Sequence, residues 1–176
     1  MKILDLGCGT GLTPTKLNLP KEWQFVGVDV SHSAIRRAAS QFPERGFAIS
    51  QGERLPFADA QFDRVIANVS LPYMNIPRAL AEIHRVLAPQ GKLWASLHTL
   101  RFTFSELRNA FPKPVPTAFR CCVLVNGLVF HLSGYSLGES FQTTRGMVAA
   151  LRRANFESPV FSHDSKHWIV EASKKL

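Results

Sequence analysis

The chain is poor in the residues that cross-link small secreted proteins. Its 176 residues include three cysteines, Cys8, Cys121 and Cys122. Three thiols cannot all pair with one another, and two of these are adjacent, so the sequence favours neither a disulfide framework nor a zinc cluster. We therefore expect free thiols and no metal site.

Long apolar runs are also missing. No uninterrupted apolar stretch reaches the roughly 18 residues that suggest a membrane span. No secretory signal pattern precedes the first motif, which begins almost at Met1. These two absences predict a soluble, cytoplasmic protein with no membrane span.

Acidic residues are outnumbered, at 13 against 21 Lys and Arg, which gives a formal net charge of +8. Clustered basic residues release counterions from a phosphate backbone, so such a charge raises the question of nucleic acid as a partner. Here the basic residues are scattered, and pairs such as Arg36-Arg37 and Arg152-Arg153 are typical of a solvated helix face. RNA is therefore kept only as an alternative partner.

No internal repeat, low-complexity tract or second-domain boundary divides the chain, so we expect one domain over residues 1–176. Strand-like and helix-like patterns alternate in its first part, with Ser31 and Asn75 placed to cap two helices. This alternation predicts right-handed crossovers and a doubly wound parallel sheet. The expected strands are 2–6, 23–30, 46–51, 62–70 and 92–98, and the longer expected helices are 32–42 and 76–88.

The alternation stops after His98, and residues 99–140 are expected to form a variable insertion on the substrate side. The prolines of "FPKPVP" argue against a helix there, and Asn126-Gly127 between apolar flanks predicts a hairpin, with an interrupted helix as the alternative. We interpret its phenylalanines as packing on the sheet, with a pocket cover or a partner surface as alternatives. They are Phe102, Phe104, Phe111, Phe119 and Phe130.

Regular patterns return after residue 142. A helix is expected over 143–157, with Thr143 or Thr144 as its cap and Asn155 in a left-handed ending. The segments 158–162 and 167–173 then read as an antiparallel pair of strands.

The most informative stretch is "ILDLGCGTG", residues 3–11. Gly7, Gly9 and Gly11 follow a strand and open a helix, so the backbone can approach a ligand and point free amides at it. The spacing lacks the G-x-G-x-x-G fingerprint, and no Lys-Ser/Thr pair makes a phosphate loop. Asp5 would repel a pyrophosphate, whereas it suits a ligand that carries an ammonium and a sulfonium.

A second acid supports a nucleoside ligand. Asp29 ends the second expected strand, at the place where an acid accepts hydrogen bonds from both ribose hydroxyls. Asp29 therefore favours a nucleoside ligand, while Asp5 and the glycine spacing disfavour an NAD(P)-dependent oxidoreductase.

Four motifs occur in the order and approximate spacing of a known family. They are "LDLGCGTG", "VGVDVS", "GERLPFADAQFDRV" and "ALAEIHRVLAPQGKL". Through them residues 2–98 resemble the class I S-adenosylmethionine-dependent methyltransferases. The resemblance implies an α/β fold, a Rossmann-like, mostly parallel seven-stranded sheet with an antiparallel C-terminal hairpin. It also implies the cofactor S-adenosyl-L-methionine and the product S-adenosyl-L-homocysteine.

The resemblance assigns a role to each motif position. Asp5 and the loop of Gly7, Cys8, Gly9 and Gly11 would hold the methionine end of the cofactor. Asp29 would bind the ribose, Val30 would lie beside the adenine, and Asn68 would lie beside the reacting methyl group. The adenine edge would meet Gln51, which replaces the aspartate of many relatives, and the backbone of Gly52 or Glu53.

The acceptor is less defined, and we expect a small molecule. Residues 69–75, His98 and the 99–140 insertion would form the wall of its site. Tyr73 and His98 are the candidates for orienting the acceptor or taking its proton, although a structural hydrogen-bonding role is the simpler interpretation for each. No catalytic residue is assigned, because the sulfonium is already an activated leaving group.

Several other residues are given structural interpretations. Leu55-Pro56-Phe57 is read as a turn that packs Phe57, and Glu82 and Arg85 are read as helix-surface residues. His131 and Tyr135 lie where a substrate could reach them. The alternatives for function are an RNA- or protein-directed methyltransferase and a noncatalytic S-adenosylmethionine-binding protein.

Overall fold

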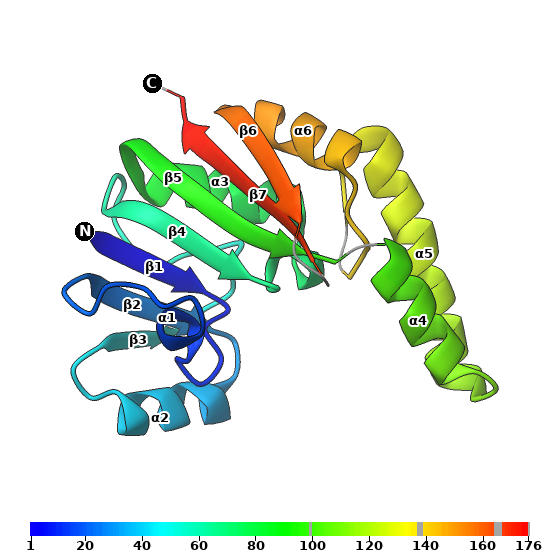
Figure 1. Cartoon of the computed structure of the whole chain (residues 1–176), viewed down its shortest axis with the longest axis horizontal. Coiled ribbons are helices and arrows are strands. Elements are labelled where there is room, and N and C mark those ends of the chain that lie inside the picture. Colours follow the sequence, from blue (N-terminus) through cyan, green and yellow to red (C-terminus); the bar gives the residue numbers. More distant parts are fainter. Residues whose placement is uncertain (99, 137–138, 164–166, 176) are drawn as a thin grey trace.

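A mixed sheet lies at the centre of the computed structural model, which describes residues 1–98, 100–136, 139–163 and 167–175 (Figure 1). Within these ranges its seven strands follow the order β3-β2-β1-β4-β5-β7-β6. The first five are parallel, whereas β7 pairs antiparallel with both β5 and β6. The expected doubly wound sheet with an antiparallel C-terminal hairpin is confirmed.

The strands are β1 Lys2–Leu6, β2 Gln24–Asp29, β3 Gly46–Ile49, β4 Phe62–Asn68, β5 Leu87–Leu97, β6 Phe156–His163 and β7 Trp168–Lys174. The helices are α1 Thr13–Lys16, α2 His32–Gln41, α3 Ile76–Val86, α4 Leu100–Ala110, α5 Pro114–Ser133 and α6 Thr144–Arg153, with a short 3-10 helix, η1, at Leu71–Tyr73.

Side-chain caps fix where the helices begin. Ser31, Asn75 and Thr143 each accept a hydrogen bond from the backbone amide three residues on, which satisfies one of the amides that a helix leaves without a partner. Asn155 has a φ of 58° just after α6, as expected. The short polar side chains therefore set these boundaries as the sequence predicts.

The two faces of the sheet bury unequal cores. Leu4 and Val65 point into a large core that α3 and α6 cover, whereas their neighbours Ile3 and Ile66 point into a small cluster on the opposite face. Trp23 and Trp94 pack against that small cluster. Alternate residues of each strand thus serve opposite layers, as strand geometry requires.

Strand β5 begins earlier than expected. Leu87 already pairs with Phe62, and the register then shifts so that Lys92 pairs with Arg64. Gly91, which lies between the expected helix 76–88 and the expected strand 92–98, therefore falls at an irregularity inside a longer strand, where Gln90 adopts a φ of 61°.

The hairpin predicted within residues 99–140 is wrong, because Leu100–Ala110 and Pro114–Ser133 form the helices α4 and α5. Pro112 precedes α5, and Pro114 and Pro116 fall in its first turn, where a missing amide costs little because the first turn has no helical partner for it. Asn126 and Gly127 lie inside α5, which runs through them without a hairpin. The Asn126 side chain donates to the carbonyl of Glu139, and a Cβ on Gly127 would overlap the ring of Phe141. Gly127 therefore allows the close approach of another segment.

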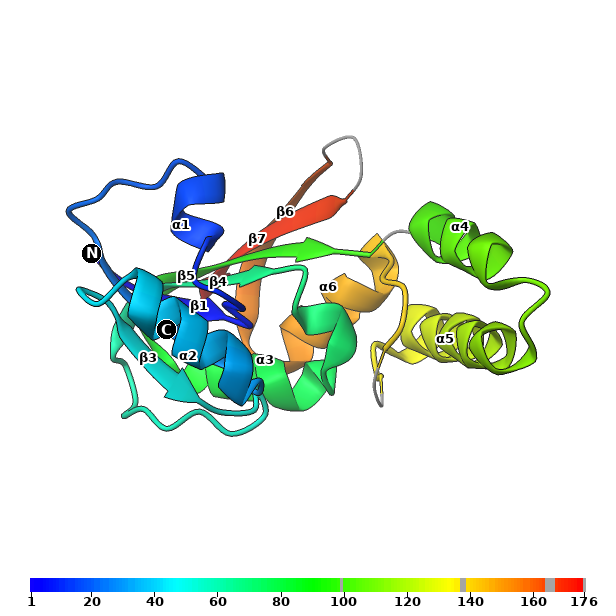
Figure 2. The ribbon, with the colours of Figure 1, turned by 90° about the horizontal axis from the view of Figure 1, so that it is seen from below.

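Helices α4 and α5 pack on each other and project from the sheet as an arm (Figures 1 and 2). We use "the arm" for residues 100–133. Phe130 is buried in the large core and lies against Gly146 of α6, and the half-buried Phe102 packs beside the His98 ring. Phe104, Phe111 and Phe119 are at least half exposed, so the expected packing on the sheet is wrong for these three. Within the described residues, α5 is the one helix long and apolar enough to cross a membrane by length and composition, over Pro116–Ser133. Its polar residues interrupt the apolar run without breaking the helix.

The last elements match expectation except at one boundary, because α6 ends at Arg153, and Phe156 and Glu157 of the expected helix belong to β6. α6 leads through Asn155 into β6, which pairs with β7. The turn expected around residues 163–166 lies mostly outside the described residues.

Candidate cofactor and acceptor site

A cavity of about 330 Å³ opens at the carboxyl ends of β1, β2 and β4. The strand order reverses between β1 and β4, which is the position where open α/β sheets bind ligands. The predicted cofactor-site residues that line the cavity are Gly7, Asp29, Val30 and Asn68. Tyr73, Val69, Ser70 and Met74 also line it, as expected for the 69–75 wall, together with Leu6 and Ser50, which the sequence did not single out.

The glycine-rich loop uses its amides within the protein. The amides of Gly7 and Cys8 both donate to the carbonyl of Val28, at 2.8 and 2.9 Å, and that of Gly9 donates to Asp29 Oδ2 at 2.9 Å. The Gly11 amide donates to the Cys8 carbonyl. The prediction that these glycines point free amides at a ligand is therefore wrong. The loop is not built as an anion cradle.

Gly7 is fixed by the loop that follows β4. It has a φ of 73°, and a Cβ at this position would overlap that of Ser70. The Ser70 hydroxyl donates to the carbonyl of Leu6 at 2.5 Å. Only glycine fits both this conformation and this close approach.

Asp5 lies beneath the loop and is 3 % exposed. Its Oδ1 atom is buried, and no described residue hydrogen-bonds it. Burial raises the pKa of this carboxyl to about 7; the negative charge of Asp29 adds to this, and a hydrogen bond with Thr13 opposes it. A buried carboxyl with an unused oxygen attracts a cationic group, because such a group would stabilise the ionised form.

Asp29 holds the loop to the end of β2. Its Oδ2 accepts from Gly9 and its Oδ1 accepts from the amide of Ser31 at 2.8 Å. Each carboxylate oxygen can accept more than one hydrogen bond, so both keep capacity for a pair of ligand hydroxyls. Val30 is 63 % exposed beside it and offers an apolar surface.

Asn68 is held at the end of β4. Ser96 donates its hydroxyl to Asn68 Oδ1 at 2.8 Å and accepts from the Val69 amide, also at 2.8 Å. Val69 has a φ of 58°, which a β-branched residue adopts only under strain. The strained turn directs the chain from β4 into η1 along the cavity wall.

The segment expected at the adenine edge divides into two kinds of residue. Gln51 is exposed, whereas Gly52 is buried against Met74. The Glu53 carboxylate accepts from the amide of Asn75 at 2.7 Å, so its side chain ties this segment to the start of α3. None of the three lines the cavity, and their roles toward a cofactor stay predictions.

Tyr73 and His98 meet, as their assignment to one wall requires. The Tyr73 hydroxyl lies 3.5 Å from His98 Nε2, and the rings pack edge to face. Burial lowers the pKa of His98 to about 4, with the charges of His167 and Arg120 adding to the effect, so the ring is neutral at pH 7. Burial likewise raises the pKa of the Tyr73 hydroxyl, with the charge of Glu139 adding to it. Both groups are therefore set to exchange hydrogen bonds rather than to carry charge.

Other residues take up structural positions. Cys8 is buried, and burial raises the pKa of its thiol to about 12. His131 contacts Thr143 through Nδ1 at 3.0 Å, and Tyr135 lies under the guanidinium of Arg153. These contacts give His131 and Tyr135 structural partners, and neither of these two residues lines the cavity.

Glu82 and Arg85 do more than cover a helix surface, which corrects that interpretation. Glu82 accepts from the Leu55 amide, and Arg85 donates to the carbonyls of Leu55 and Phe57 as well as to Glu82 and Asp59. Together they attach the 53–59 loop to α3. The expected packing of Phe57 is confirmed by its edge-to-face contact with Phe62.

The whole arrangement suits a nucleoside with a positively charged tail. The Asp29 carboxylate can accept hydrogen bonds from two hydroxyls, and the apolar side chain of Val30 lies beside it. On the neighbouring strand, the buried carboxyl of Asp5 has one oxygen, Oδ1, to which no described residue hydrogen-bonds. The cavity volume is at the lower end of the range for small-molecule sites.

Comparison with protein families matches residues 4–95 to a model described as a methyltransferase domain. Among curated proteins, the chain is 31% identical over 170 residues to a malonyl-[acyl-carrier protein] O-methyltransferase of Geobacter sulfurreducens, covering 93% of this chain and 58% of that protein. It is 35% identical over 89 residues to the human mitochondrial arginine-hydroxylase NDUFAF5, covering 50% of this chain and 26% of that one. The chain thus spans less than two thirds of the length of these relatives.

Among solved structures, an S-adenosylmethionine-dependent methyltransferase of Methanosarcina mazei superimposes with a TM-score of 0.69. The match covers 99% of this chain and 92% of that one at 21% identity. This likeness extends the shared fold beyond residue 95, to the arm and the C-terminal hairpin.

Proposed function

This chain belongs to the class I S-adenosylmethionine-dependent methyltransferases, and from that membership we propose that it transfers a methyl group from S-adenosyl-L-methionine to a small-molecule acceptor. The observation that carries the proposal is the buried, unpartnered oxygen of Asp5 beneath a loop whose amides are already used. Such a site disfavours phosphate and favours a cationic methionine tail. Relatives named as O-methyltransferases support the small-molecule acceptor.

The residues present fit the cofactor that the family implies. Asp5 would balance the positive charge of the methionine end, and Asp29 would accept both ribose hydroxyls while its backbone contacts keep the carboxylate fixed. Val30 would cover the adenine. When bound, the cofactor supplies an activated methyl group on a sulfonium.

The acceptor side would involve Asn68 and Tyr73, which line the cavity, and His98, which contacts Tyr73. Because Asn68 Oδ1 already accepts a hydrogen bond from Ser96, the amide nitrogen of Asn68 would be the group that donates to a ligand. The neutral His98 ring and the Tyr73 hydroxyl can orient an acceptor hydroxyl or amine. Fixing the acceptor in line with the methyl group is where most of the acceleration of such a displacement arises.

Calorimetric titration with S-adenosyl-L-homocysteine tests the cofactor site. We expect Asp29→Ala to weaken binding at least tenfold, because a carboxylate bonded to two ligand hydroxyls and to the loop is lost. Glu157→Ala, which removes an exposed acid on β6, is the matched control and should leave binding unchanged. Equal or tighter binding of NADH would overturn the proposal.

A labelled-methyl screen then separates the candidate acceptors. The enzyme is incubated with methyl-labelled cofactor and, separately, with metabolite, RNA and protein pools. Label in the metabolite pool supports the proposal, whereas label confined to RNA or protein supports a macromolecule-directed enzyme. Cofactor binding without label in any pool supports the noncatalytic alternative.

A further inference from the structure

The arm carries an apolar surface with no partner. α5 buries Val123, Gly127 and Phe130 toward the rest of the chain. A stripe at positions 121, 125, 128 and 132 faces away, and Val125, Leu128 and Leu132 are each more than half exposed. Spacings of four, three and four residues place these side chains on one helix face. An exposed apolar stripe of this length marks an interaction surface.

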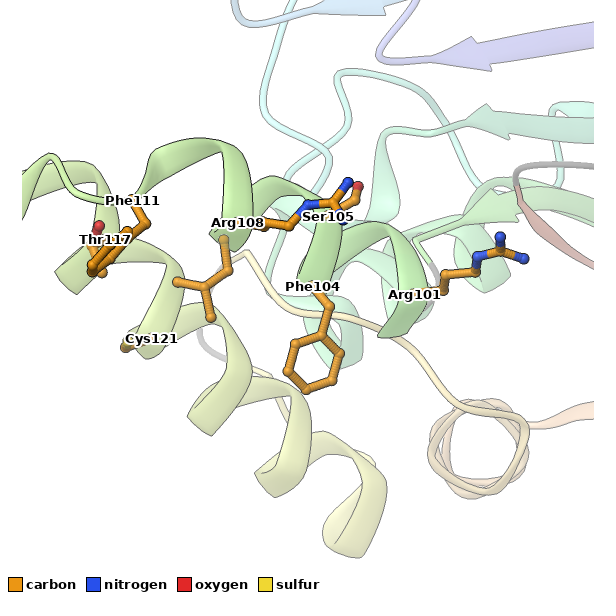
Figure 3. A pocket seen from close by; sticks show the side chains of 8 residues that line it. Arg101, Phe104, Ser105, Arg108, Phe111, Thr117 and Cys121 are labelled. Carbon is orange, nitrogen blue, oxygen red and sulfur yellow. The ribbon is translucent and has the colours of Figure 1, made fainter.

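The stripe meets α4 at Cys121, which lines a groove of about 830 Å³ together with Phe104 and Phe111. Figure 3 shows Arg101 and Phe111 toward opposite ends of α4, with Phe104 between them, and Cys121 on the facing helix. Phe104 and Phe111 are 53% and 73% exposed. Two helices therefore present one apolar surface rather than two separate ones.

The charges around this surface have one sign. Among the described side chains of the arm, the exposed charged ones are Arg101, Arg108 and Lys113, all basic. The acidic Glu106 is half-buried and pairs with Arg120, which also binds Glu139. The arm thus combines exposed apolar side chains with a basic rim and no exposed acid among those residues.

From these features we propose that the arm binds the surface of a membrane that contains anionic lipids. Its apolar stripe enters the boundary between headgroups and acyl chains, and its basic residues contact lipid phosphates. α5 is about 30 Å long and apolar enough for the hydrocarbon region, but Arg120, Asn126 and His131 along its length favour lying in the interface over spanning it. This inference stands apart from the proposed function, because it uses no residue of the cavity.

Flotation with phospholipid vesicles tests it. The full chain is mixed with vesicles of phosphatidylcholine alone, or with vesicles that also contain about 30 mol% of the anionic lipid phosphatidylglycerol. We expect binding to the anionic vesicles that weakens as salt is raised and is at least tenfold weaker to the neutral ones. Absence of binding to both overturns the proposal.

Matched substitutions locate the surface. Arg108→Gln and Lys113→Gln should each weaken binding about fivefold, whereas Arg36→Gln, on the exposed face of α2, should not. Leu128→Ser combined with Leu132→Ser should weaken it at least tenfold, whereas Val160→Ser, an equally exposed residue on β6, should not. Equal losses in the arm and control variants would overturn the assignment to the arm.

A fluorophore on a native thiol supplies a second readout, which leaves the basic residues of the arm and Val125, Leu128 and Leu132 unsubstituted. Cys8 is buried, so Cys122→Ser leaves Cys121 as the exposed thiol of the described chain. An environment-sensitive fluorophore on Cys121 should shift to shorter wavelength with anionic vesicles and be quenched by brominated acyl chains. If the shift instead follows protein concentration without lipid and sedimentation shows a dimer, a second copy covers this face and the proposal is wrong.

Discussion

Asp5 and His98 are two buried titratable residues whose pKa values move in opposite directions. Burial raises the pKa of Asp5 from 3.8 to about 7 and lowers the pKa of His98 from 6.5 to about 4. Between pH 4 and 7 the folded protein keeps a proton on Asp5 that the unfolded chain has released, so Asp5 makes the free energy of unfolding fall as pH rises. His98 stays neutral when folded and is protonated when unfolded, so it makes that free energy rise up to pH 6.5.

The two contributions offset each other, at roughly 4 kcal/mol for Asp5 and roughly 3 kcal/mol for His98. We predict that Asp5→Asn gains stability relative to the parent protein as pH rises from 4 to 7, because the cost of ionising a buried carboxyl is removed. His98→Gln should show the reverse. Its free energy of unfolding relative to that of the parent protein should be highest near pH 4 and should fall as pH rises toward 7. Thermal unfolding of the three proteins without ligand, at closely spaced pH values, measures both slopes. Parallel curves for all three would contradict the prediction.

The same shift in Asp5 predicts a pH dependence of cofactor binding. The α-ammonium of S-adenosyl-L-homocysteine favours the ionised carboxyl of Asp5, so the affinity for this ligand should increase as pH rises toward 8 and level off above the pKa of Asp5. Titration calorimetry from pH 5.5 to 8.5 checks this. Asp5→Asn should bind more weakly at pH 8 and lose the dependence. A parent affinity that is flat with pH would mean that Asp5 does not meet the charged end of the ligand.

The sequence predicted Asp5, Gly7 and Asp29 as parts of one site, because they lie at the ends of strands that meet at one edge of the sheet. It did not predict the state of the loop amides, since the carbonyl of Val28 and the carboxylate of Asp29 that accept from them lie about twenty positions away. Val69 had no sequence signal either, because a valine with positive φ breaks local preference. Local sequence patterns therefore could not predict the long-range hydrogen bonds of the loop or the strained backbone at Val69.

At the scale of elements, Arg85 joins α3 to the loop that carries the predicted adenine-edge residues. Arg85→Lys keeps the charge but loses the planar fork that reaches the carbonyls of Leu55 and Phe57. We expect a loss of about 1–3 kcal/mol in the free energy of unfolding. Faster amide exchange at Leu55 should accompany it. Arg78→Lys, on the exposed face of the same helix, is the control, and equal effects of the two would show that the fork is dispensable.

Gly127 decides how closely the 139–142 segment packs on α5. Alanine is the better helix former, yet its Cβ would overlap the Phe141 ring, so Gly127→Ala should destabilise the protein by about 1–3 kcal/mol. Denaturant unfolding measures the change. Adding Phe141→Leu should recover part of the loss beyond additivity. A stabilising Gly127→Ala would instead indicate that the segment can move aside.

These contacts also explain why residues 99–140 were predicted wrongly. An Asn-Gly pair between apolar residues has the local signature of a hairpin, and prolines at alternate positions have that of a non-helical segment. The prolines were compatible with a helix only because α5 starts at them. Gly127 was required by a partner segment rather than by a turn.

At the scale of the whole molecule, most of the sheet followed from the sequence. Five parallel strands, their crossover helices and the C-terminal pair were predicted from alternating patterns and caps, because local periodicity and helix boundaries determine them. The orientation of the arm away from the sheet was not, since it depends on which apolar faces find partners. An apolar helix that remains exposed has the same pattern as one that is buried.

The position of β7 has a consequence for how the protein is made. β7 follows β6 along the chain but lies between β5 and β6 in the sheet. During synthesis, β6 therefore has no strand to join until β7 has left the ribosome, and the outer edge of β5 stays unpaired for that time. Unpaired strand edges attract other chains, so this interval is when the nascent protein is most exposed to aggregation and most dependent on chaperones.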